Sequence, residues 1–162
     1  MIELSDLLNP SRIGCQRNIR SKKRALQTLA ELLGPSVSEG LEDDELSDMD
    51  IFDALITRER LGSTALGHGV ALPHSRLANI DAPIAALITL ADGIDYEAAD
   101  GQPVDLLVGL LVPQHCNDEH LKILADLARR FSDDYFRDEV RAFGLDESDN
   151  LYAFLQQPAP AA

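Results

Sequence analysis

Apolar residues recur every three or four positions along much of this chain, and each such stretch predicts an amphipathic helix. The first predicted helix starts after Ser21, a common N-cap residue, and Gly34 with Pro35 is expected to end it. Similar spacing in the last third of the chain predicts three more helices: 118–131 capped by Asn117, one capped by Ser132 and ending at Gly144, and 146–155.

Another helix is predicted between Ser47 and Gly62, with aspartates in its first turn and arginines in its last turn. Positive charge at a helix C-terminus complements the helix dipole. Arg58 and Arg60 are therefore compatible with a purely structural role at this helix end.

Two continuous apolar runs, 85–90 and 104–112, are bounded by turn residues and predict buried strands, the second of them central. Short extended pieces are predicted at 65–66 and 70–72. Because helical and strand periodicities alternate, we expect an α/β fold: a single domain with a mixed central β-sheet of about five strands flanked by helices. Residues 158–162 are expected to form a flexible tail.

Composition narrows the class of protein. The chain has 162 residues and is 45% hydrophobic, enough for one compact core. Its longest apolar run, 106–112, is too short for a bilayer, which needs about 20 residues. The first residues lack the basic and apolar regions of a secretory signal, so a cytoplasmic protein with no membrane insertion is expected. Cys15 and Cys116 are too few for a disulfide framework and are expected to be reduced.

The net charge of -14 argues against nucleic-acid binding, which favours clustered Lys and Arg. The charge is also uneven, since the segment 39–50 holds seven acidic residues. This segment could steer a basic protein partner, or it could simply be a solvated approach to the next helix.

Candidate chemistry is concentrated in the Gly-punctuated segment 62–73, which leads to His74. Imidazole is nucleophilic in its neutral form and can hold a phosphoryl group that stays reactive. Four residues of the segment could contact such a group, two through hydroxyls and two through accessible backbone: Ser63, Thr64, Gly67 and Gly69. A hairpin-like turn between two edge strands explains the same pattern without any ligand.

Two further residues could complete a phosphoryl site at His74. Arg58 could neutralise the charge of the group. His120, in the first turn of the predicted helix 118–131, could donate a hydrogen bond because the helix dipole there favours a neutral imidazole. A helix-end arginine and a capping or surface histidine are the ordinary alternatives.

A family resemblance is carried by RERLGSTALGHGVALPHSRL and NDEHLKILADLARRF. These segments resemble the IIA component of the mannitol/fructose class of the phosphoenolpyruvate-dependent phosphotransferase system, and most closely its nitrogen-regulatory branch. The resemblance covers residues from about 21 to 131. It implies that His74 is the phosphohistidine and that His120 and Arg58 are active-site residues. His68 departs from the family pattern, in which asparagine or another polar residue is usual, and adds a third imidazole.

The resemblance also implies a function. Residues 1–157 are expected to form an EIIA type-2 domain, a phosphocarrier that accepts a phosphoryl group from an HPr-like phosphohistidine donor of the NPr type. Such a protein regulates target proteins according to its phosphorylation state. No metal or other cofactor is implied, and the oligomeric state and the targets stay open. The alternatives are a IIA component of a fructose/mannitol-type sugar transporter and a non-enzymatic binding regulator that carries no phosphate.

Other chemistries fit the sequence less well. Metal binding could use four histidines and one cysteine, but their spacing matches no common zinc frame: His68, His74, His115, Cys116 and His120. No G-x-S-x-G motif is present for a serine hydrolase, and no Walker loop for nucleotide hydrolysis.

Overall fold

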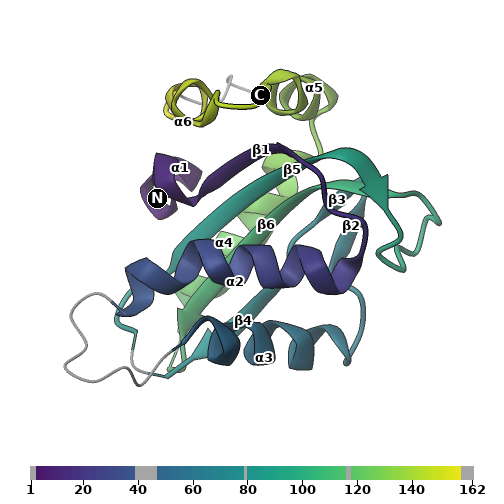
Figure 1. Cartoon of the computed structure of the whole chain (residues 1–162). Coiled ribbons are helices and arrows are strands. Elements are labelled where there is room, and N and C mark those ends of the chain that lie inside the picture. The colour runs from purple at the N-terminus through teal and green to yellow at the C-terminus, as the bar shows by residue number, and fades with distance from the viewer. Residues whose placement is uncertain (1–2, 39–46, 79, 116–117, 158–162) are drawn as a thin grey trace.

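The computed structural model describes residues 3–38, 47–78, 80–115 and 118–157, and the side chains of Ser38, Glu119 and His120 also lie outside the description. Within these ranges, helices cover both faces of a mixed β-sheet (Figure 1). The elements follow in the order α1 (Leu4–Leu7), the 3-10 helix η1 (Pro10–Arg12), β1 (Ile13–Arg17), α2 (Lys22–Ser38), α3 (Asp48–Glu59), β2 (Ala65–Gly67), β3 (Val70–Ala71), β4 (His74–Leu77), β5 (Ile84–Ile94), β6 (Val104–Pro113), α4 (Asp118–Phe131), α5 (Asp134–Ala142) and α6 (Ser148–Leu155).

The sheet has six strands in the described part of the chain, in the order β1-β5-β6-β3-β2, with β4 also paired to β6. β5 and β6 are antiparallel, as are β2 and β3, whereas β1 runs parallel to β5, and β3 and β4 run parallel to β6. The mixed α/β architecture confirms the predicted fold class. The sheet has one strand more than the five or so that were predicted, because two short strands, β3 and β4, lie beside β6.

These two pieces, β3 and β4, lie on one line along β6. Val70 pairs with Leu106 and His74 with Leu110, which is the same register offset. Pro73 interrupts the line because proline has no N–H for the ladder, although its carbonyl accepts a hydrogen bond from the Leu110 N–H at 2.9 Å. Among the described strands β4 pairs only with β6, so His74 begins an edge strand.

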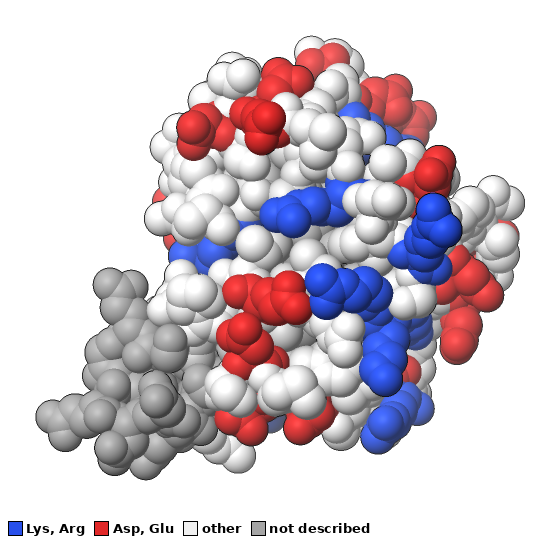
Figure 2. Space-filling model, viewed as in Figure 1, with Lys and Arg blue, Asp and Glu red and all other residues white. Residues whose placement is uncertain are grey.

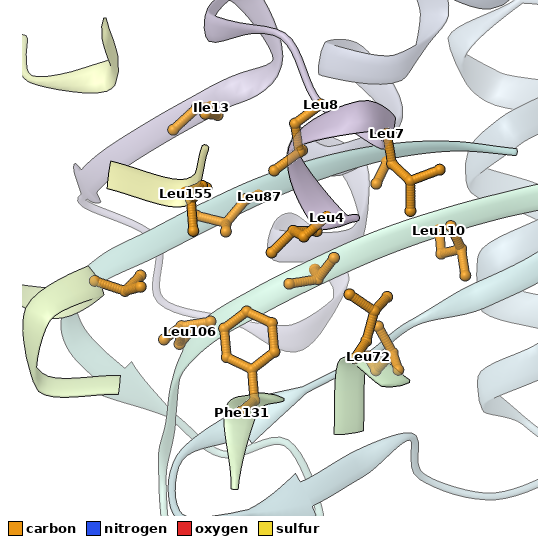
Figure 3. Packing of buried hydrophobic residues seen from close by; sticks show 14 of the residues in the cluster. Leu4, Leu7, Leu8, Ile13, Leu72, Leu87, Leu106, Leu110, Phe131 and Leu155 are labelled. Carbon is orange, nitrogen blue, oxygen red and sulfur yellow. The ribbon is translucent and has the colours of Figure 1, made fainter. Parts of the chain in front are cut away.

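Alternate residues of β6 supply two hydrophobic cores. Leu106, Val108 and Leu110 pack against α1 and the C-terminal helices (Figure 3), whereas Leu107 and Leu111 pack against α2 and α3 on the other face. All five side chains are fully buried. This confirms the prediction that the continuous apolar run is a central strand.

The starts of α2 and α3 follow the predicted caps. Ser47 Oγ accepts a hydrogen bond from the Asp50 N–H, and the Asp50 carboxylate accepts one from the Ser47 N–H at 2.9 Å, which forms a capping box. Ser21 Oγ accepts a hydrogen bond from the Arg24 N–H at 3.1 Å. Both helices begin at the residue after the predicted cap.

The predicted end of α2 is wrong. The helix passes through Gly34 and Pro35 and continues to Ser38. Leu33 and Val37, one turn apart on either side of the proline, are both buried in the core. This packing outweighs the loss of one N–H donor near the end of the helix.

The predicted cap of α5 is displaced by one residue. Asp133, not Ser132, accepts the hydrogen bond from the Phe136 N–H, at 3.3 Å. The Ser132 hydroxyl instead donates to the Arg129 carbonyl at 2.6 Å, in the turn that ends α4. The predicted cap Asn117 and the predicted tail 158–162 lie outside the described residues.

Charged side chains are unevenly distributed over the surface. On the face in Figure 2, Lys and Arg gather over the neighbouring ends of α2 and α3, and acidic residues gather over α5 and α6. Most of the acidic segment 39–50 lies outside the description, so its proposed steering role stays a prediction.

Two further expectations concern membranes and thiols. None of the helices in the described ranges has the length and apolar composition needed to cross a bilayer. Cys15 is a buried free thiol, and burial raises its pKa; Cys116 is outside the description.

Candidate functional site

A pocket of about 630 Å³ opens at the outer edge of β4, between α3 and α4. Its apolar wall consists of Ala54, Leu61, Leu110, Val112, Leu121 and Leu124. Its polar residues are Asp53, Thr57, Arg58, His74, Ser75 and Arg76. The pocket thus brings together two of the predicted site residues, Arg58 and His74, which are sixteen residues apart in the chain.

The imidazole of His74 has a defined orientation. Its Nδ1 lies 2.8 Å from the Leu72 carbonyl oxygen, and the ring is partly buried. A carbonyl oxygen can only accept a hydrogen bond, so Nδ1 carries the proton in this contact. The lone pair of the neutral ring then lies on Nε2, the nitrogen available as a nucleophile.

Arg58 lies in the last turn of α3 and lines the same pocket as His74. Its Nη1 donates a hydrogen bond to the Gly62 carbonyl at 3.0 Å. Arg60 is the C-cap residue of α3, is exposed and is not part of the pocket lining. The helix end therefore presents one of its two arginines to His74.

Arg76 and Asp53 also line the pocket, although no sequence pattern predicted them as site residues. Arg76 follows His74 by two residues on β4, and alternate residues of a strand share a face. The sequence does not reveal this two-residue alternation, because the strand has only four residues, follows a proline and is mostly polar. Among the described residues neither Arg58 nor Arg76 forms an ion pair, so two guanidinium groups and one carboxylate face the pocket.

The hydroxyls of Ser63 and Thr64 have partners elsewhere. Ser63 Oγ donates to the Tyr96 carbonyl at 3.1 Å. The Thr64 hydroxyl contacts the Glu59 carboxylate and lies 3.2 Å from the Tyr96 hydroxyl, in a buried position. Neither residue belongs to the pocket lining, and the expected contact of their hydroxyls with a phosphoryl group stays a prediction.

The glycines of the loop form a hairpin turn between β2 and β3. Gly67, His68 and Gly69 have positive φ angles of 92°, 58° and 79°. A Cβ atom on Gly69 would lie 2.6 Å from Arg141 Nη2 and 3.0 Å from Asp105 Oδ1. The close approach that requires glycine at position 69 is thus made by side chains from α5 and β6. Gly67 and Gly69 both lie outside the pocket lining.

His68 lies at the tip of this turn, with an exposed side chain. Its N–H donates to Asp100 Oδ2 at 3.1 Å, and hydrogen bonds from the N–H groups of Gln102 and His68 lower the pKa of Asp100. β3 and β4 follow one line along β6 from Val70 to His74, which spans about 13 Å at the rise of a strand, and His68 lies in the turn before this line. The third imidazole therefore lies well away from the pocket.

His120 lies in the first turn of α4, and its side chain is outside the description. The next residue, Leu121, lines the pocket. The N-terminus of α4 is therefore beside His74, and the predicted role of the His120 imidazole stays a prediction.

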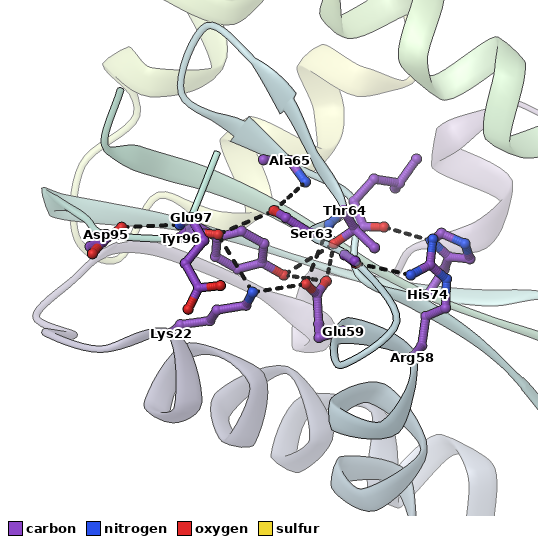
Figure 4. A network of polar contacts seen from close by, with 12 residues as sticks. Lys22, Arg58, Glu59, Ser63, Thr64, Ala65, His74, Asp95, Tyr96 and Glu97 are labelled. Carbon is purple, nitrogen blue, oxygen red and sulfur yellow. Dashed lines mark hydrogen bonds and ion pairs between the residues drawn. The ribbon is translucent and has the colours of Figure 1, made fainter. Parts of the chain in front are cut away.

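A buried polar network lies directly beside the pocket (Figure 4). Its centre is Glu59, whose side chain is 2% exposed. Glu59 Oε2 lies 3.0 Å from Lys22 Nζ, and Oε1 accepts a hydrogen bond from the Tyr96 hydroxyl at 2.8 Å. The Thr64 N–H also donates to Oε2, at 3.3 Å. Burial, and then the charge of Glu59, raise the pKa of Tyr96 far above its usual value.

No local sequence pattern indicated this network, because its members come from α2, α3, the turn after α3 and the connection between β5 and β6. Metal ligation receives no support from the described side chains, among which no group of three or more His, Cys, Asp or Glu could hold an ion. Cys116 and the His120 side chain, two of the five candidate ligands, lie outside the description.

Known proteins match this chain over most of its length. The family model "Phosphoenolpyruvate-dependent sugar phosphotransferase system, EIIA 2" matches residues 6–157. A "Nitrogen regulatory protein" from Pseudomonas aeruginosa is 39% identical over 142 residues, which are 88% of each chain. Another from Bradyrhizobium diazoefficiens is 35% identical over 159 residues, 98% of each chain. The crystal structure of nitrogen regulatory protein IIA-Ntr from Neisseria meningitidis has a TM-score of 0.83 at 34% identity and covers 94% of this chain and 99% of its own.

Proposed function

We propose that this chain, which belongs to the phosphoenolpyruvate-dependent sugar phosphotransferase system EIIA 2 family, accepts a phosphoryl group on His74 and acts as a regulatory phosphocarrier. The family membership confirms the resemblance found in the sequence. One observation carries the proposal: the 2.8 Å contact between His74 Nδ1 and the Leu72 carbonyl, inside a pocket shared with Arg58.

This contact supports different tasks for the two ring nitrogens of His74 in the proposed reaction. Nδ1–H stays bonded to the Leu72 carbonyl, and the Nε2 lone pair attacks the phosphorus of a donor phosphohistidine. The new N–P bond forms as the N–P bond of the donor breaks, and the donor nitrogen keeps that electron pair. The carbonyl also stabilises the partial positive charge that the His74 ring acquires.

Cationic groups then neutralise the phosphoryl oxygens. Arg58 has a planar guanidinium that can hold two oxygens at once, and its side chain is oriented by the bond to the Gly62 carbonyl. Arg76 adds a second positive charge at the same pocket. The chain as a whole has a net charge of -14, so these two positive charges make the pocket a local exception that attracts an incoming anion.

The N-terminal turn of α4 completes the proposed site. Free N–H groups at a helix N-terminus attract anions, and Leu121 places this turn on the pocket wall. His120, from the same turn, is proposed to donate a hydrogen bond to a phosphoryl oxygen. Ser63 and Thr64 are left out of the proposal because their hydroxyls have other partners, and Gly67 and Gly69 are left out because they are not part of the pocket lining.

The proposed donor is an HPr-like phosphocarrier of the NPr type, and the proposed targets are regulatory proteins that distinguish the two phosphorylation states. The names of the relatives, which are nitrogen regulatory proteins, favour this role. The cytoplasm is the compartment in which we propose the exchange. The family description names a sugar phosphotransferase system, so a sugar-transport IIA component is the second candidate.

Reconstituted phosphorylation tests these functions. The protein is incubated with phosphoenolpyruvate, enzyme I and either HPr or an NPr-type donor, and the phosphosite is mapped under alkaline conditions that preserve phosphohistidine. We expect one acid-labile phosphoryl group on His74, with faster transfer from the NPr-type donor. A mannitol- or fructose-type IIB protein is then added.

The outcomes separate the candidates. Rapid onward transfer to the IIB protein would favour the sugar-transport role. No phosphorylation from either donor would contradict the proposal and favour a pure binding regulator. Phosphate on His68 or His120 in the wild-type protein would show that His74 is not the acceptor.

A further inference from the structure

Glu59 is a buried carboxylate that joins three parts of the chain. It follows Arg58 at the end of α3, and its partners are Lys22 on α2, Thr64 after the turn, and Tyr96 beyond β5. The Thr64 N–H and hydroxyl both contact the carboxylate. Ser63 and Lys22 in addition bond to the Tyr96 carbonyl, at 3.1 and 3.5 Å.

This carboxylate is more heavily engaged than helix termination requires. Burying an ionised carboxylate is costly unless a counter-charge and hydrogen bonds satisfy it. Here both oxygens are satisfied, and the ammonium of Lys22 also lies 4.4 Å from the centre of the Tyr96 ring. The network thus fixes the position of Glu59 relative to α2 and to the sheet.

The same network fixes the short turn that holds Arg58. The turn leaves α3 at Glu59, and Thr64 bonds back to the Glu59 carboxylate, so the carboxylate closes the loop formed by residues 59–64. Inside that loop, the Gly62 carbonyl accepts the hydrogen bond from Arg58 Nη1. Glu59 therefore holds the acceptor that orients the guanidinium.

In Figure 4 the side chains of Arg58 and Glu59 point in different directions. Glu59 points toward Lys22 and Tyr96, whereas Arg58 lies beside His74. Consecutive helical residues project about 100° apart, so a clamp on one fixes the azimuth of the other. A small misplacement of a group that stabilises the transition state is costly to the rate.

We propose that Glu59 is a positioning residue for phosphoryl transfer, which holds the 58–64 turn so that the Arg58 guanidinium faces His74. This inference rests on the proposed function. It assigns the buried network a role in the reaction beyond stabilising the fold.

The experiment is a double-mutant cycle of Arg58→Ala and Glu59→Gln, with maximal transfer rate and half-saturating donor concentration measured separately. Gln keeps the size of Glu59 but removes the charge and one acceptor atom. We expect Arg58→Ala to lower the maximal rate about 100-fold, and Glu59→Gln about tenfold with little change in half-saturation. In the Arg58→Ala background, Glu59→Gln should change the rate less than about twofold, because there is no guanidinium left to position.

The matched control is Glu31→Gln. Glu31 forms an exposed ion pair with Arg24 at 3.1 Å on α2, away from the turn. This variant should transfer at the wild-type rate. Thermal unfolding of every variant shows that each is folded at the assay temperature. If Glu59→Gln is not folded, Tyr96→Phe replaces it. This change removes one hydrogen bond to Glu59 and keeps the Lys22 ion pair. It should slow transfer about threefold in the protein that keeps Arg58, and should have no such effect in the Arg58→Ala variant.

Three results would overturn the proposal. A wild-type rate for folded Glu59→Gln would show that the turn needs no clamp. An equal loss in both backgrounds would mean that the network acts on stability or on another part of the site. A wild-type rate for Arg58→Ala would contradict the proposed site itself, which is a different failure from the first two.

Discussion

Arg58 and Glu59 are adjacent in the chain but belong to two regions of opposite character. Glu59 lies in a closed region where each charge has a partner, and among the described residues no buried side-chain N or O atom lacks a hydrogen bond. Arg58 lies in an open pocket, where two guanidinium groups face His74 without ion pairs from the described part of the chain.

The difference separates stability from function. Removing a member of the closed region leaves its partners buried and unsatisfied, so the cost falls on the folded state. Charges in the open pocket are solvated in the free protein and can exchange water for phosphoryl oxygens. Substitutions in the pocket should therefore change transfer, and substitutions in the network should change stability as well.

The largest expected effect is at His74. His74→Ala should abolish phosphorylation by the reconstituted donor system, because no other described imidazole lies in the pocket. The residue is partly buried on an edge strand, so the thermal midpoint should change little. Intact-mass measurement and thermal unfolding check the two halves. Phosphate on the variant, or an unfolded variant, would contradict the distinction between the functional pocket and the stabilising network.

The next largest effect is expected at Arg58. Arg58→Ala should slow transfer about 100-fold, because losing one preorganised hydrogen-bond donor to the transition state has a cost on this scale. Arg60→Ala is the control, because Arg60 is exposed at the same helix end but outside the pocket lining. It should transfer at nearly the wild-type rate in stopped-time assays. Equal losses from both variants would mean that the arginines merely stabilise the helix end.

A smaller effect is expected in the closed region at high pH. The raised pKa of Tyr96 means that the unfolded chain loses this proton above about pH 10 while the folded protein keeps it. The free energy of unfolding is unaffected by this group below pH 10 and should then fall by up to about 1.4 kcal/mol per pH unit. Urea unfolding of wild type and Tyr96→Phe between pH 8 and about pH 11 measures this slope. Identical slopes would show that Tyr96 is not protected from ionisation.

The smallest expected effect is at His68. His68→Asn should leave the transfer rate unchanged at acidic and neutral pH, since His68 lies in the turn before β3 with an exposed side chain, outside the pocket lining. The same assay with Arg58→Ala serves as the positive control. A large loss at neutral pH would show that the turn tip takes part in the reaction.

Local signals in the sequence determined much of the fold. The capping residues Ser21 and Ser47 mark helix starts because their side chains bond to N–H groups two or three residues away. The apolar runs of β5 and β6 mark central strands because both faces of a central strand are covered. The pairing of Arg58 with His74 came from the family resemblance, and the structure places the two in one pocket.

Other elements were decided by contacts between distant residues. β1 pairs with β5, and the Gln16 N–H bonds to a hydroxyl 73 residues away, so no local pattern predicted that strand. β4 exists because its backbone extends the line of β3 along β6. Pro35 remains helical because Leu33 and Val37 pack into the core.

The site divides in the same way. Sequence alone predicted a nucleophilic histidine, a helix-end arginine and a Gly-rich loop, since these predictions rest on residue type and spacing. It could not show that Thr64 faces Glu59, that Gly69 accommodates Arg141, or that Arg76 faces the pocket. Those relations depend on which segments the tertiary structure brings together, because burial and hydrogen-bond partners are properties of the packed chain and not of its local sequence.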